Sequence, residues 1–267
     1  MSTDVWADRL GARIASDARP WIDRASILDE CVSTQDEALA RADGRPGLLV
    51  VARRQTGGRG REGRAWAHVG ELGLACTFAL DGSSTADPLL AIRVGLAAAE
   101  ACDPWAPPGG RIGVKWPNDV VAMTADERGP HAKLGGVLIE VKGGLALAGI
   151  GINVLHRAGD WPPGLAATAS SLAASRPDAP VPTREGVLER VIDGLDRWLG
   201  ATSTEVRAAF AARDTLTGTV RTFVYDNREC TGEVVSIDPD GRIVLRAAGG
   251  VAVSIHARGA RLMPGMG

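Results

Sequence analysis

The sequence predicts an α/β (α+β) protein with a large N-terminal domain and a small C-terminal β-module. In the first part of the chain, apolar runs of strand length alternate with amphipathic helical patterns. From Thr217 the pattern changes to short strands separated by turns. The length of 267 residues and the hydrophobic content of 45% suit one sizeable domain plus a small one. We therefore predict two domains, residues 1–213 and 214–267.

Strands of the large domain are predicted where apolar residues run continuously between glycine, proline or charged residues. The predicted strands are Ser26–Val32, Leu48–Arg53, Leu72–Leu80, Arg111–Trp116, Leu134–Val141 and Leu145–Val154. The predicted helices are one from Ser33 and Thr34 to Gly44, and then Leu89–Cys102, Thr183–Leu199 and Thr204–Arg213. Thr34 and Glu37 have the spacing of a capping box. The proline- and alanine-rich stretch His156–Pro182 is predicted to be a long surface loop with room for one short helical turn.

The C-terminal module is predicted to be β-barrel-like. Its predicted strands are Thr219–Tyr225, Cys230–Ile237, Ile243–Arg246 and Val251–His256. Turns are expected at Asp226–Asn227 and around Pro239. Because a module of roughly fifty residues has a marginal core of its own, we expect it to lean on the larger domain.

The composition argues against several classes of protein. A net charge of −2 is unlike that of a dedicated nucleic-acid binder, although a local arginine cluster can still grip a phosphate group. The four cysteines form no CxxC pair and lie apart from the histidines, so neither a metal site nor a disulfide framework is predicted. No signal peptide or membrane span is recognisable, which predicts a cytoplasmic protein.

The segment Gln55–Trp66, which reads QTGGRGREGRAW, carries the strongest chemical signal. Its glycines let the backbone approach an anion closely, and its arginines can bind phosphate or carboxylate in bidentate fashion. The pattern therefore predicts a site for a dianionic or polyanionic ligand. A solvated basic loop or an RG-type RNA tether is the alternative for this segment taken alone.

Two of the three lysines in the chain also lie in short motifs. Lys115 opens KWPND at a strand end, where proline fixes the backbone and a tight bend presents Asn118 and Asp119. A turn with a solvated lysine explains this motif equally well. Lys133 opens KLGGVLIE, whose two glycines indicate a ligand, a bulge or a closely packed neighbour. In GIGINV, alternating glycines leave one face of the strand without side chains next to Asn153, a pattern that packing alone usually explains.

Taken together and in this order, QTGGRGREGRAW, KWPND, KLGGVLIE and GIGINV resemble the biotin protein ligases over roughly residues 25–265. The resemblance implies a catalytic domain with a mixed sheet flanked by helices, related to class II aminoacyl-tRNA synthetases, and a C-terminal SH3-like β-barrel. It also implies an enzyme that joins biotin to ATP, giving biotinyl-5'-AMP and pyrophosphate. The biotin then passes to a lysine of a biotin carboxyl carrier protein domain, with Mg²⁺ helping to neutralise the phosphates.

The resemblance assigns roles to individual residues. Lys133, Arg61 and Asp119 are the expected catalytic residues, with Lys133 between the biotin carboxylate and the α-phosphate. The expected biotin contacts are Ser33, Thr34, Gln35, Gln55, Arg59, Gly60, Arg61 and Lys133. The expected ATP contacts are Arg59, Arg61, Arg64, Trp66, Asn118, Lys133 and Asn153. Many members have Asn where this chain has Gln35, and the roles of Gln35 and Lys115 stay open.

Only 25 residues precede the first predicted strand, too few for the helix-turn-helix domain of bifunctional members. We therefore expect a monofunctional ligase that binds neither DNA nor membranes, as a monomer or weak homodimer. A lipoate or octanoyl transferase shares the implied fold and is one alternative. A non-catalytic phosphate- or RNA-binding module is the other. The connection from Met123 to Ala132 is predicted to be a hairpin tip.

Overall fold

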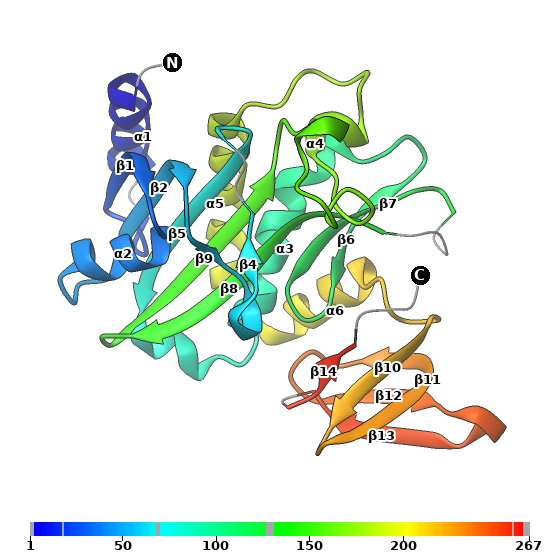
Figure 1. Ribbon diagram of the computed structural model, residues 1–267. Helices are drawn as coiled ribbons and strands as arrows, with labels where there is room; N and C mark the ends of the chain where they lie inside the picture. Colours follow the sequence, from blue (N-terminus) through cyan, green and yellow to red (C-terminus); the bar gives the residue numbers. More distant parts are fainter. Residues whose placement is uncertain (1–2, 18, 68–69, 127–130, 258, 264–267) are drawn as a thin grey trace.

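A computed structural model describes residues 3–17, 19–67, 70–126, 131–257 and 259–263. The larger part of the molecule is built on a seven-stranded sheet, shown in Figure 1. Its strands are β1 (Arg24–Cys31), β2 (Leu48–Gln55), β5 (Gly73–Asp81), β6 (Arg111–Lys115), β7 (Asp119–Met123), β8 (Ala132–Lys142) and β9 (Leu145–Asn153). They lie in the order β1-β2-β5-β9-β8-β7-β6. β1 pairs with β2 in parallel and the other neighbours are antiparallel, so the predicted mixed sheet is confirmed.

Helices cover both faces of this sheet (Figure 1). The helices are α1 (Thr3–Asp17), α2 (Thr34–Ala42), α3 (Leu90–Cys102), α4 (Leu172–Ser175), α5 (Arg184–Gly200) and α6 (Ser203–Arg213). On one face, Ala38 and Ala42 of α2 pack with Val50 and Leu147. On the other face, α3 is buried between the sheet and α5. Gly194 of α5 permits this packing, because a Cβ there would lie 2.9 Å from Ala97 Cα.

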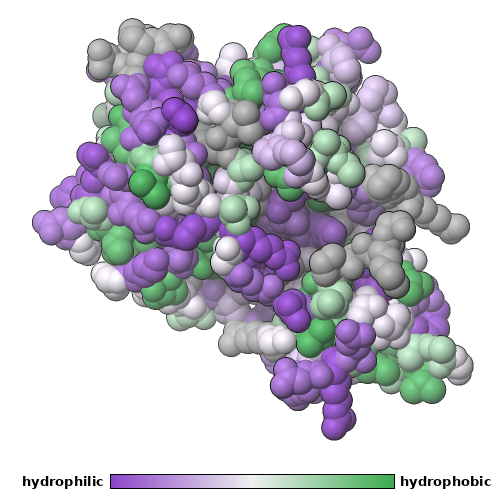
Figure 2. Space-filling view, in the orientation of Figure 1, coloured by the Kyte–Doolittle hydropathy of each residue, from purple (hydrophilic) through white to green (hydrophobic). Residues whose placement is uncertain are grey.

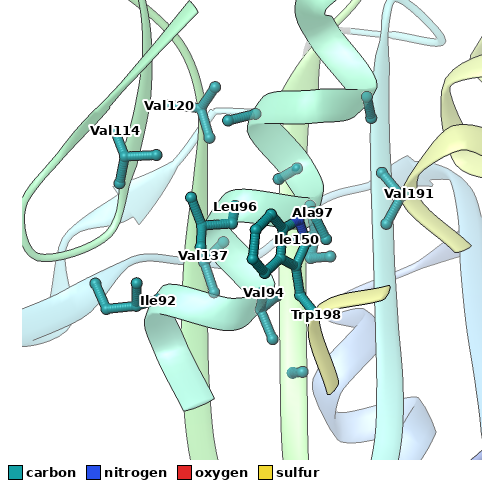
Figure 3. Close-up of a cluster of buried hydrophobic side chains, with 14 of the residues drawn as sticks. Ile92, Val94, Leu96, Ala97, Val114, Val120, Val137, Ile150, Val191 and Trp198 are labelled. Atoms are coloured by element: carbon teal, nitrogen blue, oxygen red, sulfur yellow. The ribbon is translucent and has the colours of Figure 1, made fainter. Parts of the chain in front are cut away.

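The main hydrophobic core lies between the sheet, α3 and α5, and Figure 3 shows part of it. Val94 and Leu96 of α3 meet Val137 and Ile150 of the sheet, and Trp198 of α5 closes the cluster. Successive residues of a strand point to opposite faces. Ala148 and Ile150 therefore enter this core, while Gly149 and Gly151 face the α2 side. The α2 side of β8 and β9 is thus left with little side-chain bulk.

The C-terminal residues form a separate five-stranded antiparallel sheet. Its strands are β10 (Val220–Tyr225), β11 (Arg228–Ile237), β12 (Arg242–Arg246), β13 (Ala252–His256) and β14 (Arg261–Leu262), in the order β13-β12-β11-β10-β14. Asp226 and Asn227 turn between β10 and β11 with positive φ, as type I′ hairpins require. Phe223 contacts Trp116, which follows β6 of the large sheet, with ring centroids 6.1 Å apart. The small sheet therefore leans on the larger domain, as expected.

Several local predictions differ from the structure. The capping box at Thr34 is wrong: Ser33 is the N-cap of α2 without a side-chain capping bond, and Thr34 begins the helix. The helix itself ends at Ala42, and Gly44 follows the C-cap Asp43 with positive φ, as expected of a glycine that closes a helix. Helix α1 and strands β7 and β14 were not predicted. Of the connection predicted between Met123 and Ala132, residues 127–130 lie outside the described residues.

Cys31, Cys76 and Cys102 are buried, and Cys230 is partly exposed. Burial raises the pKa of all three buried thiols, that of Cys31 to about 11. Because the thiolate is the reactive form, we expect iodoacetamide at pH 8 to modify Cys230 first in the folded protein. Mass spectrometry of timed samples measures this order, and all four thiols should react together in denaturant. Fast modification of Cys76 in the folded protein would contradict the burial.

Within the described residues, no helix is long and apolar enough to cross a membrane.

Candidate active site

A cavity of about 260 Å³ lies on the α2 side of the large sheet, where β8 and β9 carry glycine. Hydrophilic residues predominate on the face seen in Figure 2, around a recess near its centre. Polar side chains, glycines and apolar side chains share the cavity wall. The polar side chains and glycines are Ser33, Thr34, Gln35, Gln55, Arg59, Gly60, Arg61, Arg64, Trp66, Asn118, Asp119, Lys133, Gly136, Gly149 and Gly151, and the apolar residues include Leu138, Ile150 and Leu165.

One end of the cavity is polar but uncharged. Gln55, the last residue of β2, accepts hydrogen bonds at Oε1 from the backbone N–H of Thr34 (2.9 Å) and from its hydroxyl (3.2 Å). Thr77 of β5 donates to the Thr34 hydroxyl (2.9 Å). These side chains are buried, so the chain of hydrogen bonds holds them in place at the N-terminus of α2. This end suits a neutral ligand group with its own donors and acceptors.

Gln35 forms the floor of this end. Its Nε2 donates to the carbonyl oxygens of Leu138 (2.9 Å) and Leu147 (3.4 Å), and so bridges β8 and β9. A Cβ on Gly149 would lie 2.9 Å from that Nε2 and 3.1 Å from the amide carbon. Gly149 is therefore needed for Gln35 to lie flat on the sheet.

We expect Gly149→Ala to push the Gln35 side chain up into the cavity. Overpacking of this kind costs on the order of 1–3 kcal/mol, so affinity for a ligand seated there should fall about tenfold or more. Titration calorimetry with biotin, the ligand that the resemblance of the four motifs implies, measures the change. Gly200→Ala is the matched control, since a Cβ there meets nothing within 4 Å. Equal biotin affinity in the Gly149 variant would show that Gln35 does not limit the space.

The arginine–glycine segment, Gln55–Trp66, folds over the cavity as a short ribbon. β3 (Gly58–Arg59) pairs with β4 (Ala65–Trp66), and a single 3₁₀ turn, Arg61–Gly63, joins them. The turn depends on positive φ at Glu62 and Gly63. Trp66 rests on the backbone of β9, because a Cβ on Gly151 would lie 2.5 Å from its ring.

The opposite end of the cavity is charged. Lys133 Nζ lies 2.7 Å from Asp119 Oδ1 and 5.5 Å from the centre of the Trp66 ring. A bulge brings Lys133 here: Val120 pairs with Gly135 and Val121 with Lys133, so Leu134 is the extra residue. One of the alternatives for the glycine pair in KLGGVLIE, a bulge, is thus present next to Gly135.

The KWPND motif forms the turn between β6 and β7. The Trp116–Pro117 peptide is cis. Asn118 forms two hydrogen bonds with Val137 of β8. The side-chain Nδ2 of Asn118 donates to the backbone carbonyl of Val137 (2.8 Å), and the backbone carbonyl of Asn118 accepts from the backbone N–H of Val137 (2.9 Å). The turn is therefore fastened to the sheet at the point where Asn118 and Asp119 reach the cavity.

Arg61, which begins the 3₁₀ turn, and Arg64, which follows it, differ from Arg59 on β3 in their ion-pair partners. Arg61 and Arg64 line the cavity, and Arg64 pairs with Glu62 at 3.2 Å. Arg59 also lines the cavity, and it forms two hydrogen bonds with Asp36 (2.6 and 2.8 Å) and one with Glu140 (3.2 Å). The hydrogen bonds from Arg59 lower the pKa of Asp36. The same hydrogen bonds raise the pKa of Arg59.

A second cavity of about 210 Å³ adjoins the charged end. Arg61, Arg64 and Asn118 belong to both cavities, and Lys115 and Arg261 line this one as well. The pKa of Lys115 is lowered, mainly because its ammonium group is buried. The C-terminal sheet thus reaches the edge of the site through β14.

Comparison with known proteins connects this geometry to a family. The Biotin/lipoate A/B protein ligase family model matches residues 29–155. The biotin–(acetyl-CoA-carboxylase) ligase of Paracoccus denitrificans is 30% identical over 237 residues, covering 84% of this chain and 95% of that protein. This chain belongs to the biotin protein ligase family.

Further relatives agree with this membership. The biotin–(acetyl-CoA-carboxylase) ligase of Mycobacterium tuberculosis is 29% identical over 263 residues, covering 88% of this chain and 94% of that protein. The Aquifex aeolicus biotin protein ligase in complex with biotin and ATP has a TM-score of 0.71 and 26% identity, covering 90% and 99% of the two chains. The resemblance inferred from the four motifs is therefore confirmed.

In this family member, the cavity brings together all but one of the predicted site residues. Asn153 is the exception: its buried amide donates to the carbonyl oxygens of Lys133 (3.2 Å) and Ser170 (3.0 Å), outside the cavity lining. Leu165 lines the cavity but was not predicted, because it lies in a loop without periodicity. The bare face predicted from GIGINV is present, and Gln35 and Trp66 occupy it.

Proposed function

We propose that this chain is a biotin protein ligase that activates biotin with ATP and transfers it to a lysine of a biotin carboxyl carrier protein domain. The observation that supports this most is the polarity of the cavity, with uncharged hydrogen-bonding groups at one end and Lys133, Arg61 and Arg64 at the other. Biotin has the same polarity, with a neutral ring system and a carboxylate at the end of a chain.

In this proposal the uncharged end receives the biotin rings. Ser33, Thr34, Gln35 and Gln55 contact them, and the carboxylate points toward Lys133. ATP lies on the other side of Lys133, with its phosphates near Arg61, Arg64 and Asn118 and its adenine near Trp66. Asn153 then acts indirectly, because its amide holds the backbone of Lys133.

The first step joins two anions. A carboxylate oxygen of biotin forms a bond to the α-phosphorus of ATP, the bond from that phosphorus to the bridging oxygen breaks, and pyrophosphate leaves with the electron pair. Lys133 is placed to neutralise the charge that builds on the α-phosphate, and Asp119 holds its ammonium group at 2.7 Å. Arg61 shields the product from water.

Magnesium is proposed to arrive with ATP. Within the described part of the chain, no group of three or more His, Cys, Asp or Glu side chains could hold a metal ion by itself. Magnesium bound to phosphates needs only one or two protein oxygens, which Asn118 and Asp119 can supply from the cavity wall. It would neutralise phosphate charge there.

The second step is acyl transfer. The amine of the carrier lysine bonds to the carbonyl carbon of the anhydride, the bond from that carbon to the phosphate oxygen breaks, and AMP leaves. We assign Asp119 to orient the amine and accept its proton.

Exchange of labelled pyrophosphate into ATP tests the proposal. We expect exchange that depends on biotin, and label from biotin in an added carrier domain. Exchange that depends on lipoate instead would favour the alternative acyl transferase of this fold. Phosphate binding without exchange would favour the non-catalytic module.

A further inference from the structure

Arg59 is held by carboxylates of the protein itself. It forms two hydrogen bonds with Asp36, at 2.6 and 2.8 Å, and a third with Glu140 at 3.2 Å. Lys142 takes the other oxygen of Glu140 at 3.1 Å. Two acidic groups already balance the charge of Arg59, so it offers less attraction to a ligand anion than Arg61.

The partners of Arg59 come from distant parts of the chain. Asp36 lies in the first turn of α2, next to Gln35, and Glu140 lies on β8, on the same strand face as Leu138. Arg59 thus joins the ribbon over the cavity to the helix and to the strand that form the cavity wall. The side chain of Arg59 is 34% exposed and that of Glu140 is 23% exposed, so water screens this pair only in part, while Asp36 is 51% exposed and its pair is screened more.

The other attachments of the arginine–glycine segment are short. β3 and β4 pair with each other over two residues each. Two backbone hydrogen bonds, from Thr56 to Cys31 (2.9 Å) and from Gly57 to Val32 (2.8 Å), fix the start of the segment. Trp66 fixes its end on Gly151. The stretch between depends on side-chain contacts, of which those of Arg59 are bidentate and charge-assisted.

We propose that Asp36 and Glu140 are positioning residues that hold the arginine–glycine segment closed over the cavity through Arg59. Arg59 is then a structural latch, while Arg61 and Trp66, which follow it in the same segment, contact the ligand. The inference rests on the proposed function for the identity of that ligand. It gives the glutamate of KLGGVLIE a role that the sequence left without one.

The test uses the full chain with Asp36→Asn combined with Glu140→Gln. Both changes keep side-chain size and remove the charge that Arg59 needs. We expect labelled biotinyl-5'-AMP to dissociate about tenfold faster, since the amide oxygens of Asn and Gln still accept hydrogen bonds from Arg59 but more weakly than the carboxylates do. The rate of exchange at saturating substrates should change by less than about threefold, so the loss appears in KM and not in kcat. Glu37→Gln is the matched control, because Glu37 lies in the same turn of α2 and pairs with Arg41.

Limited trypsin digestion of the ligand-free protein gives a readout that does not depend on the ligand. We expect cleavage after Arg61 and Arg64 to be slow in the wild type and in Glu37→Gln, and several times faster in the double variant. Equal cleavage and equal dissociation in the double variant and the wild type would overturn the latch. Absence of exchange in the wild type would instead overturn the proposed function. The digestion would still test whether Asp36 and Glu140 hold the segment closed, because it needs no ligand.

Discussion

Replacing Lys133 with alanine should reduce biotin-dependent exchange of pyrophosphate into ATP by a factor of at least about 10² to 10³. The ammonium group of Lys133 lies at the charged end of the cavity, between Asp119 and the Trp66 ring. In the proposed mechanism its removal would leave the charge on the α-phosphate without its nearest cation. It also leaves the Asp119 carboxylate facing two other anions. Exchange kinetics at saturating ATP and biotin measure the effect.

Two further variants make this result specific. Lys133→Arg should restore little, because a planar guanidinium cannot occupy the place of a compact ammonium group. Arg41→Ala, on the exposed side of α2, removes a positive charge from outside the cavity and should leave exchange unchanged. If Lys133→Ala retained exchange within tenfold of the wild type, the catalytic assignment would be wrong.

Gly151→Ala should have the second largest effect. The added Cβ would lie 2.5 Å from the Trp66 ring, a distance that requires the indole to leave its position on β9. Because Trp66 also faces Lys133, the nucleotide and the ammonium group would lose their alignment together. Misplacement by about 1 Å can cost about 10² in rate, and we expect a loss of that order with a raised KM for ATP.

Steady-state kinetics with varied ATP give this KM. Gly11→Ala is the control: it lies within α1, a Cβ there meets nothing within 4 Å, and the change should stabilise the helix by about 0.5–1 kcal/mol. An unchanged KM for ATP in Gly151→Ala would show that Trp66 is not part of the nucleotide site.

Much of the fold followed from local patterns. Strands such as Leu48–Gln55 and Leu145–Asn153 are buried on both faces, so their apolar runs are continuous and easy to recognise. Strand β7 was not predicted because it begins at Asp119, the last residue of KWPND, which was interpreted as a bend after a strand end. Helix α1 was not predicted either, although Trp6, Leu10 and Ile14 recur at the spacing of one buried helix face.

The sequence predicted which residues form the candidate site, but it did not predict which partners each side chain contacts. Motif residues converge because strand ends and one helix N-terminus meet on one side of the sheet. Sequence does not distinguish a buried amide that serves backbone carbonyls, as Asn153 does, from one that meets a ligand. The partners of Arg59 lie 23 and 81 residues away, so only the folded chain brings the three charges together.

Strand β9 meets two unrelated demands with alternate residues. Ala148 and Ile150 belong to the hydrophobic core under α3, where a change in side-chain volume alters the thermal stability of the protein. Gly149 and Gly151 carry Gln35 and Trp66, where one added methyl group would displace a side chain of the cavity wall and, in the proposed function, change which molecules enter. Thermal tolerance and substrate choice can therefore evolve, or be engineered, at neighbouring positions with little interference between them.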